Sequence, residues 1–129
     1  MGLLDKLFRR NDDDEGTAVP ISLDVEARRT QLRRFEQACD ALTAEMRSDE
    51  SRFDLPGWKE RMNEYNRVAG TAMQLRQGTP TREGLIDLAF EVRPVFTGPI
   101  PAGYEAIGPL QDEVMAAARE LQEVLPGER

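Results

Sequence analysis

The sequence contains no histidine and only one cysteine in 129 residues. The missing histidine removes the commonest general base, the usual zinc ligand and the nucleophile pairs that depend on an imidazole. A single cysteine excludes an intramolecular disulfide and every metal or redox motif that needs paired cysteines. These absences favour a binding protein over an enzyme, and we expect no metal and no cofactor. An enzyme that uses carboxylates and a metal is the alternative. Glu60 and Glu64, which are spaced by one helical turn, are an example of such a carboxylate pair.

Positive charge and long apolar runs are also scarce. Lys and Arg number 17 against 24 Asp and Glu, which gives a formal net charge of −7. Broad nucleic-acid binding needs phosphate-neutralising charge, so we expect no nucleic-acid partner. No apolar run approaches the roughly 20 residues of a membrane span, and no secretory signal pattern is visible. We therefore expect a cytoplasmic protein with one folded domain.

Composition divides the chain into three parts. Residues 1–10 form a short amphipathic segment, residues 11–20 form an acidic linker with Gly and Pro, and residues 21–129 show helical periodicity. Strand-like alternation never extends beyond a few residues. The sequence therefore predicts an all-α fold. We expect an up-and-down bundle of three to four helices, preceded by a short amphipathic helix and a flexible acidic linker.

The first bundle helix is predicted to begin with Ser22 as its N-cap. Its apolar residues follow spacings of three and four, as on a helix with one buried face: Leu32, Phe35, Cys39, Leu42 and Met46. Cys39 lies within this stripe, so we expect a buried thiol rather than a reactive one. Upstream, Arg28 does not fit the apolar register.

Four arginines on this helix are candidates for an anion site: Arg28, Arg29, Arg33 and Arg34. On a helical wheel they spread over most of the circumference. Local pairs of Glu26 with Arg29 and of Arg33 with Glu36 explain much of their placement. We expect a solvated face with ion pairs, and a small anion-binding patch is the alternative.

The second helix is predicted to open near Pro56 and to end before Gly78. Trp58 and Tyr65 lie on its apolar side, where we expect core positions. Gly70, inside this helix, would permit a close helix crossing.

The third helix is short and is expected to be capped by Thr79 or Thr81. It is apolar over more than half its circumference, so we expect it to be the most buried element and to run antiparallel to the second helix. Pro109 is placed in the first turn of the last helix or at a kink. The stripe of the last helix comprises Ile107, Leu110, Val114, Ala117, Leu121 and Val124.

The amphipathic segment, residues 1–10, separates its side chains cleanly by polarity. One side of a helical wheel is apolar, with Leu3, Leu4, Leu7 and Phe8, and the other is charged, with Asp5, Lys6, Arg9 and Arg10. This arrangement is typical of an interfacial membrane anchor or of a helix that docks in a partner's groove. Packing on its own bundle or on a sister subunit, and an unstructured start, are the alternatives. Acidic residues 12–15 follow directly and partly cancel the basic charge.

The proline-stiffened connection formed by residues 94–104 carries apolar side chains that we expect to be shielded from water. Phe96, Ile100 and Tyr104 either close the open end of the bundle or contact a partner.

These features favour a small non-enzymatic adaptor or assembly protein. It would dock through the apolar face of residues 1–10, with help from Lys6, Arg9 and Arg10, onto a protein partner or a membrane surface. One alternative is a ligand-binding or regulatory domain with a pocket between the Trp58 helix and the last helix. Another is a homo-oligomeric structural protein, because the same stripes could pair between chains.

Overall fold

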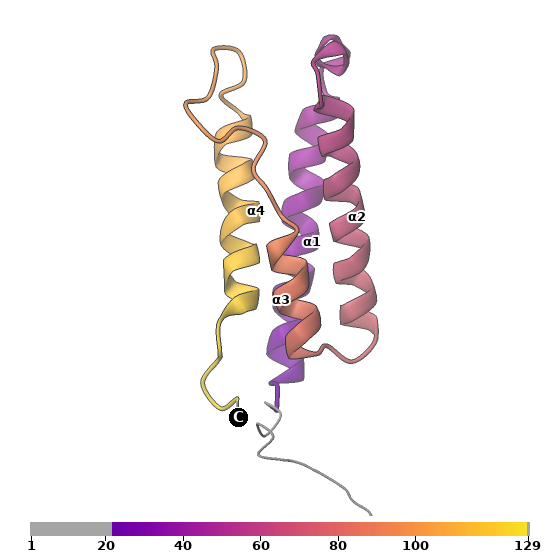
Figure 1. Cartoon of the computed structure of the whole chain (residues 1–129), viewed down its shortest axis with the longest axis vertical. Coiled ribbons are helices and arrows are strands. Elements are labelled where there is room, and N and C mark those ends of the chain that lie inside the picture. The colour runs from indigo at the N-terminus through magenta and orange to yellow at the C-terminus, as the bar shows by residue number, and fades with distance from the viewer. Residues whose placement is uncertain (1–21, 129) are drawn as a thin grey trace, which may run out of the picture.

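The computed structural model describes residues 22–128, so the predictions for residues 1–10 and 11–20 lie outside it. Within that range the chain forms four α-helices and one short 3-10 helix, with no strand. The elements are α1 (Val25–Arg47), η1 (Glu50–Asp54), α2 (Trp58–Gln77), α3 (Arg82–Phe90) and α4 (Ile107–Gln122). Successive helices alternate in direction along one long axis (Figure 1). The predicted all-α, up-and-down bundle is confirmed.

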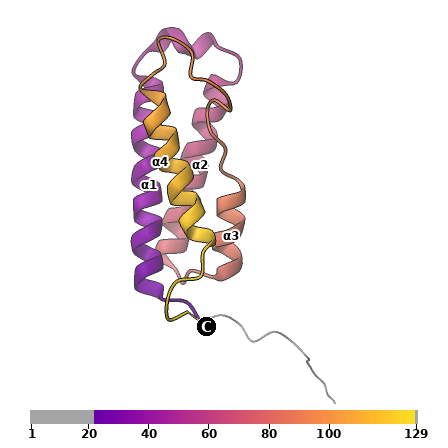
Figure 2. The ribbon, with the colours of Figure 1, turned by 90° about the vertical axis from the view of Figure 1, so that its left-hand side faces the viewer.

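The helix α1 makes the most extensive helix contacts of the bundle, against α2 and α4. The short helix α3 packs against α4 and α2. It covers only one half of the bundle's length, and residues 91–106 rise from its end to the opposite end (Figure 2). The fourth position of the bundle is therefore helical at one end and extended chain at the other.

Two helix starts differ from the sequence predictions. The N-cap of α1 is Asp24, whose side chain accepts a hydrogen bond from the amide of Ala27, so the prediction of Ser22 was wrong by two residues. Both residue types are good caps, and local sequence does not rank them. The helix α2 begins at Trp58 rather than at Pro56, because Gly57 adopts a left-handed conformation with φ of 79° that ends the preceding turn.

The core follows the predicted stripes closely on three helices. Buried side chains come from α1, α2 and α4 at the expected spacings: Leu32, Phe35, Cys39, Leu42, Met46, Trp58, Met62, Tyr65, Val68, Ala72, Ile107, Val114, Ala117 and Leu121. Val124 does not belong to the stripe, since α4 ends at Gln122 and Val124 is 55% exposed. Pro109 lies in the first turn of α4, as one of the two alternatives predicted.

The third helix is not the most buried element. Leu85, Leu88 and Ala89 are buried, but Phe90 is 72% exposed. Apolar content around a helix predicts burial only where neighbours cover every side, and α3 contacts α2 and α4 alone. Its N-cap is Thr81, one of the two predicted residues.

The close helix contact lies at Gly84 rather than at Gly70. A Cβ atom added to Gly70 would meet nothing within 4 Å, so the predicted crossing there is wrong. A Cβ atom at Gly84 would lie 2.9 Å from Leu75 Cδ2, which is closer than real Cβ contacts allow. Glycine at position 84 therefore lets α3 approach α2.

Candidate functional site

The candidate functional features lie at the two ends of the bundle. At one end α1 begins and the chain returns after α4, and at the other end lie η1, the start of α2 and the extended segment (Figure 1). Ser22, the first described residue, precedes α1 at the first of these ends.

Arg28 occupies a fully buried position, which corrects the prediction of a solvated face. It lies four residues before Leu32, so it continues the buried stripe of α1 by one turn. An arginine there requires a buried counter-charge and acceptors for its N–H groups. Glu128 supplies the charge through two bonds, from Arg28 Nε at 2.8 Å and from Nη2 at 2.7 Å.

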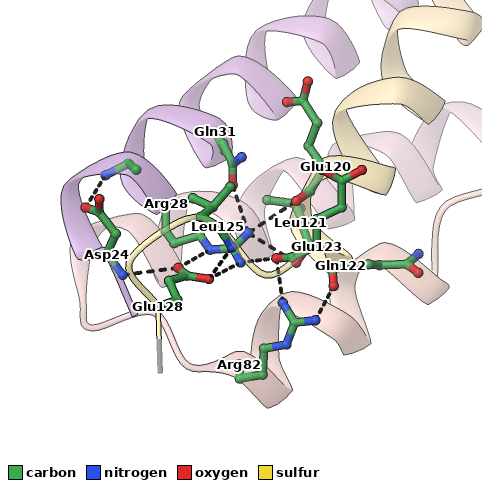
Figure 3. A network of polar contacts seen from close by, with 11 residues as sticks. Asp24, Arg28, Gln31, Arg82, Glu120, Leu121, Gln122, Glu123, Leu125 and Glu128 are labelled. Atoms are coloured by element: carbon green, nitrogen blue, oxygen red, sulfur yellow. Dashed lines mark hydrogen bonds and ion pairs between the residues drawn. The ribbon is translucent and has the colours of Figure 1, made fainter. Parts of the chain in front are cut away.

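The remaining donors of Arg28 hold the end of α4 (Figure 3). Nη1 donates to Gln31 Oε1 at 3.0 Å and to the carbonyl of Glu120 at 3.2 Å, and Nη2 donates to the carbonyl of Glu123. Carbonyls at a helix C-terminus lack intrahelical donors and carry partial negative charge. A buried guanidinium at this position therefore satisfies several of them at once.

The carboxylate of Glu128 is also held by backbone donors. The amide of Asp24 donates to Oε2 at 3.1 Å, and the amide of Leu125 donates to Oε1 at 2.9 Å. The guanidinium of Arg28 first, and then these amides, lower the pKa of Glu128 to about 2 despite its burial. We call Arg28, Glu128 and their backbone partners the clasp. It ties the start of α1 to the segment after α4.

A second arginine reinforces the clasp from α3. Arg82 donates to the carbonyl of Glu123 at 2.9 Å and to the carbonyl of Gln122 (Figure 3). The last carbonyls of α4 thus receive donors from two helices. Sequence reasoning missed Glu128 and Arg82, because both pair with positions far away in the chain.

Two other arginines of α1, Arg29 and Arg34, pair with residues of the same bundle. Arg29 pairs with Glu26 as predicted, with Nη1 2.8 Å from Oε2. Arg34 binds two carboxylates of α4, Glu113 and Glu120. The predicted pair of Arg33 with Glu36 is wrong, because Glu36 accepts from the guanidinium of Arg76 at 2.6 and 2.9 Å. Internal pairing accounts for most of these charges and leaves little for an anion patch.

At the opposite end, three aromatic rings lie in mutual contact. Trp58, Phe96 and Tyr104 have ring centroids 5.6–6.3 Å apart, with tilted or edge-to-face geometry. The Trp58 indole N–H donates to the carbonyl of Met46 at 3.1 Å. The guanidinium of Arg52 lies 4.9 Å from the Tyr104 ring centroid, within cation–π range. We call these four side chains the aromatic cluster.

A buried glutamine pins the extended segment to α4. The Gln111 side chain accepts from the amide of Phe96 at 3.0 Å and donates to its carbonyl at 3.1 Å. Phe96 and Tyr104 are partly buried and pack against the core, and Ile100 is also partly buried. The segment thus closes the aromatic end, while a partner contact through its exposed edge stays a prediction.

A cavity of about 300 Å³ opens beside Trp58. Its lining comprises Leu55, Pro56, Gly57, Trp58, Arg61, Val95 and Phe96. The predicted pocket between the Trp58 helix and the last helix is therefore misplaced, because the cavity lies between the start of α2 and the extended segment. A second cavity, of about 450 Å³, lies at the clasp end between residues 22–25 and residues 79–82.

Burial and charge pairing also decide the chemistry of the reactive side chains. Burial raises the pKa of the Cys39 thiol to about 12, with smaller contributions from Asp40 and Glu36. Glu64 is paired with Arg93 at 2.9 Å and faces Arg61 at 3.5 Å.

Between residues 22 and 128, no group of three or more His, Cys, Asp or Glu could hold a metal ion. In the same range no helix is long and apolar enough to cross a bilayer.

The predicted docking residues lie outside the described range: Leu3, Leu4, Lys6, Leu7, Phe8, Arg9 and Arg10. No family model, curated protein or solved structure matches the chain.

Proposed function

We propose that this chain is a small non-enzymatic adaptor or assembly protein of the cytoplasm that docks through residues 1–10. The observation that carries the proposal is the clean polarity split of that segment, with Leu3, Leu4, Leu7 and Phe8 on one side. The bundle would be the rigid body that this segment brings to a surface.

The clasp supports this arrangement. Its backbone hydrogen bond from the Asp24 amide to the Glu128 carboxylate fixes Asp24, so the described chain begins from a defined point at one end of the bundle. Residues 11–21 reach at most about 36 Å when extended, at about 3.3 Å per residue. The segment could thus dock at a distance from the bundle without disturbing its core.

Energetics favour weak docking by a single copy. Four large apolar side chains contribute roughly 1.5–3 kcal/mol each when fully buried. Ordering the backbone opposes this by about 1–2 kcal/mol per residue. Lys6, Arg9 and Arg10 add about 1 kcal/mol each near anionic lipid, and acidic residues 12–15 offset part of it. We therefore expect binding that needs anionic lipid, weakens with salt and strengthens with several copies.

Cell fractionation of the full chain tests the proposal. Charging the apolar face with Leu4→Asp and Phe8→Asp should move the protein from the membrane or partner fraction to the soluble fraction. The matched control is Asp5→Asn, which changes the charged face and keeps the apolar one. An unchanged distribution for the double variant would contradict the proposal. A change of assembly size without any change of fraction would favour the homo-oligomeric alternative.

A further inference from the structure

The cavity beside Trp58 has apolar walls and one cationic side chain. Its apolar lining comprises Leu55, Pro56, Trp58, Val95 and Phe96. Arg61 is the one charged residue among those that line it. Small-molecule sites share this composition, with apolar walls and a few polar groups that fix orientation.

The charge around Arg61 is not balanced by its neighbours. Glu64 receives two hydrogen bonds from Arg93, at 2.9 and 3.0 Å, and lies 3.5 Å from Arg61 Nη1. Two guanidinium groups therefore share one carboxylate. The Nη1 atom of Arg61 is shielded from solvent and has no hydrogen-bond acceptor, the only such side-chain atom among the described residues. Because Nη1 itself is closed to solvent, a ligand would meet Arg61 through the rest of the side chain, which lines the cavity and is 24% exposed. A carboxylate there would balance the second guanidinium charge.

We propose that this cavity binds an apolar group that carries a carboxylate. The carboxylate would pair with Arg61 and balance the second guanidinium charge, while the apolar part would lie against Trp58 and Phe96. A volume of about 300 Å³ is at the small end for ligand sites, which favours one ring or one short branched chain. The source is either a free small acid or the last residue of a peptide. This site does not depend on residues 1–10, so it stands or falls separately from the adaptor proposal.

The chain supplies its own reporter, because Trp58 is its only tryptophan. The full chain is titrated with 3-phenylpropionate, and Trp58 fluorescence is excited where phenyl groups do not absorb. The uncharged control is 3-phenylpropanamide. Acetyl-Ala-Phe with a free carboxylate and its amide form the peptide arms. We expect a saturable change with the acids and at least about tenfold weaker binding of both amides, the equivalent of one charge-assisted hydrogen bond.

Three variants connect the signal to the charge at Arg61. Arg61→Gln should weaken acid binding by about tenfold or more and leave the weak amide binding unchanged. Glu64→Gln should strengthen acid binding, because it removes the carboxylate that competes for Arg61. Arg67→Gln is the control, since Arg67 lies on the same helix and pairs with Glu91 away from the cavity lining.

The titrations have outcomes that overturn the proposal and outcomes that identify the source of the ligand. Equal binding of acids and amides, equal affinity of the Arg61→Gln protein, or no saturable change with any probe would overturn the proposal. Circular dichroism of each variant shows whether it is folded, and the Glu64→Gln result tests the same charge without removing a cation. Binding of 3-phenylpropionate alone identifies a free acid as the source, and tighter binding of the peptide acid identifies a chain end.

Discussion

Replacing Arg28 by methionine should destabilise the protein strongly. The side chain is fully buried and pairs with Glu128, which is buried as well. Removing one partner of a buried ion pair leaves an uncompensated charge and typically costs about 3–5 kcal/mol. The fall in the pKa of Glu128 from 4.5 to about 2 corresponds to about 3 kcal/mol, which agrees in size. Arg28→Met should therefore lower the free energy of unfolding by about 3–5 kcal/mol.

Urea denaturation with two readouts measures this effect. Circular dichroism follows all helices, and fluorescence follows Trp58, the first residue of α2. The helix α2 begins at the end of the bundle opposite the C-terminus (Figure 1). Coincident shifts of both transitions mean that the clasp stabilises the whole bundle. The matched control is Arg34→Met, because Arg34 is 41% exposed and should contribute less than about 1 kcal/mol.

A double variant isolates the pair itself. Arg28→Met combined with Glu128→Met removes both charges, and we expect a coupling of about 1–3 kcal/mol between the two sites. A loss of stability below about 1 kcal/mol for Arg28→Met, or one no larger than that of Arg34→Met, would show that the buried pair does not stabilise the bundle.

Three further predictions concern single groups. The stability that Glu128 contributes is complete above pH 4.5 and is lost as pH falls toward about 2, because its pKa is lowered in the folded state; the Glu128→Gln protein should lack this part of the acid transition when both are titrated by circular dichroism. Gly70→Ala should stabilise α2 by up to about 1 kcal/mol, since nothing obstructs the added methyl group. Gly84→Ala should be less favourable than Gly70→Ala, because its methyl group would lie 2.9 Å from Leu75 Cδ2 and 3.0 Å from Thr81 Oγ1, and equal shifts of the two melting curves would contradict this. Cys39, whose pKa is raised to about 12, should resist alkylation at pH 8 in native protein and react after unfolding, so fast native labelling would show that the core is open there.

The fold was largely predictable because three helices carry regular apolar spacings. The stripe from Leu32 to Met46 and the core positions Trp58 and Tyr65 follow from spacing alone. The exposure of Phe90 could not be predicted, because burial of a short helix depends on which neighbours cover it. Asp24 rather than Ser22 is the N-cap, and its amide also donates to the distant Glu128 carboxylate, a tertiary contact that local sequence does not reveal.

The clasp could not be predicted from sequence patterns. Arg28 interrupts an apolar stripe, and local sequence alone predicts that such a residue is solvated. The register does hold a signal, since Arg28 lies one turn before Leu32 and a charge in a buried register requires a buried partner. Nothing local identifies that partner as Glu128, 100 residues away. Likewise, the sequence shows the aromatic residues of the aromatic cluster but does not show that their rings lie in contact.

Liposome flotation measures whether residues 1–10 dock the bundle to a lipid surface. The full chain and a variant that begins at Thr17 are floated with neutral vesicles and with vesicles that contain phosphatidylserine. We expect that only the full chain floats, and that it floats more strongly with the anionic lipid. If neither protein floats and both have the same assembly size and partner binding, the proposed docking is contradicted.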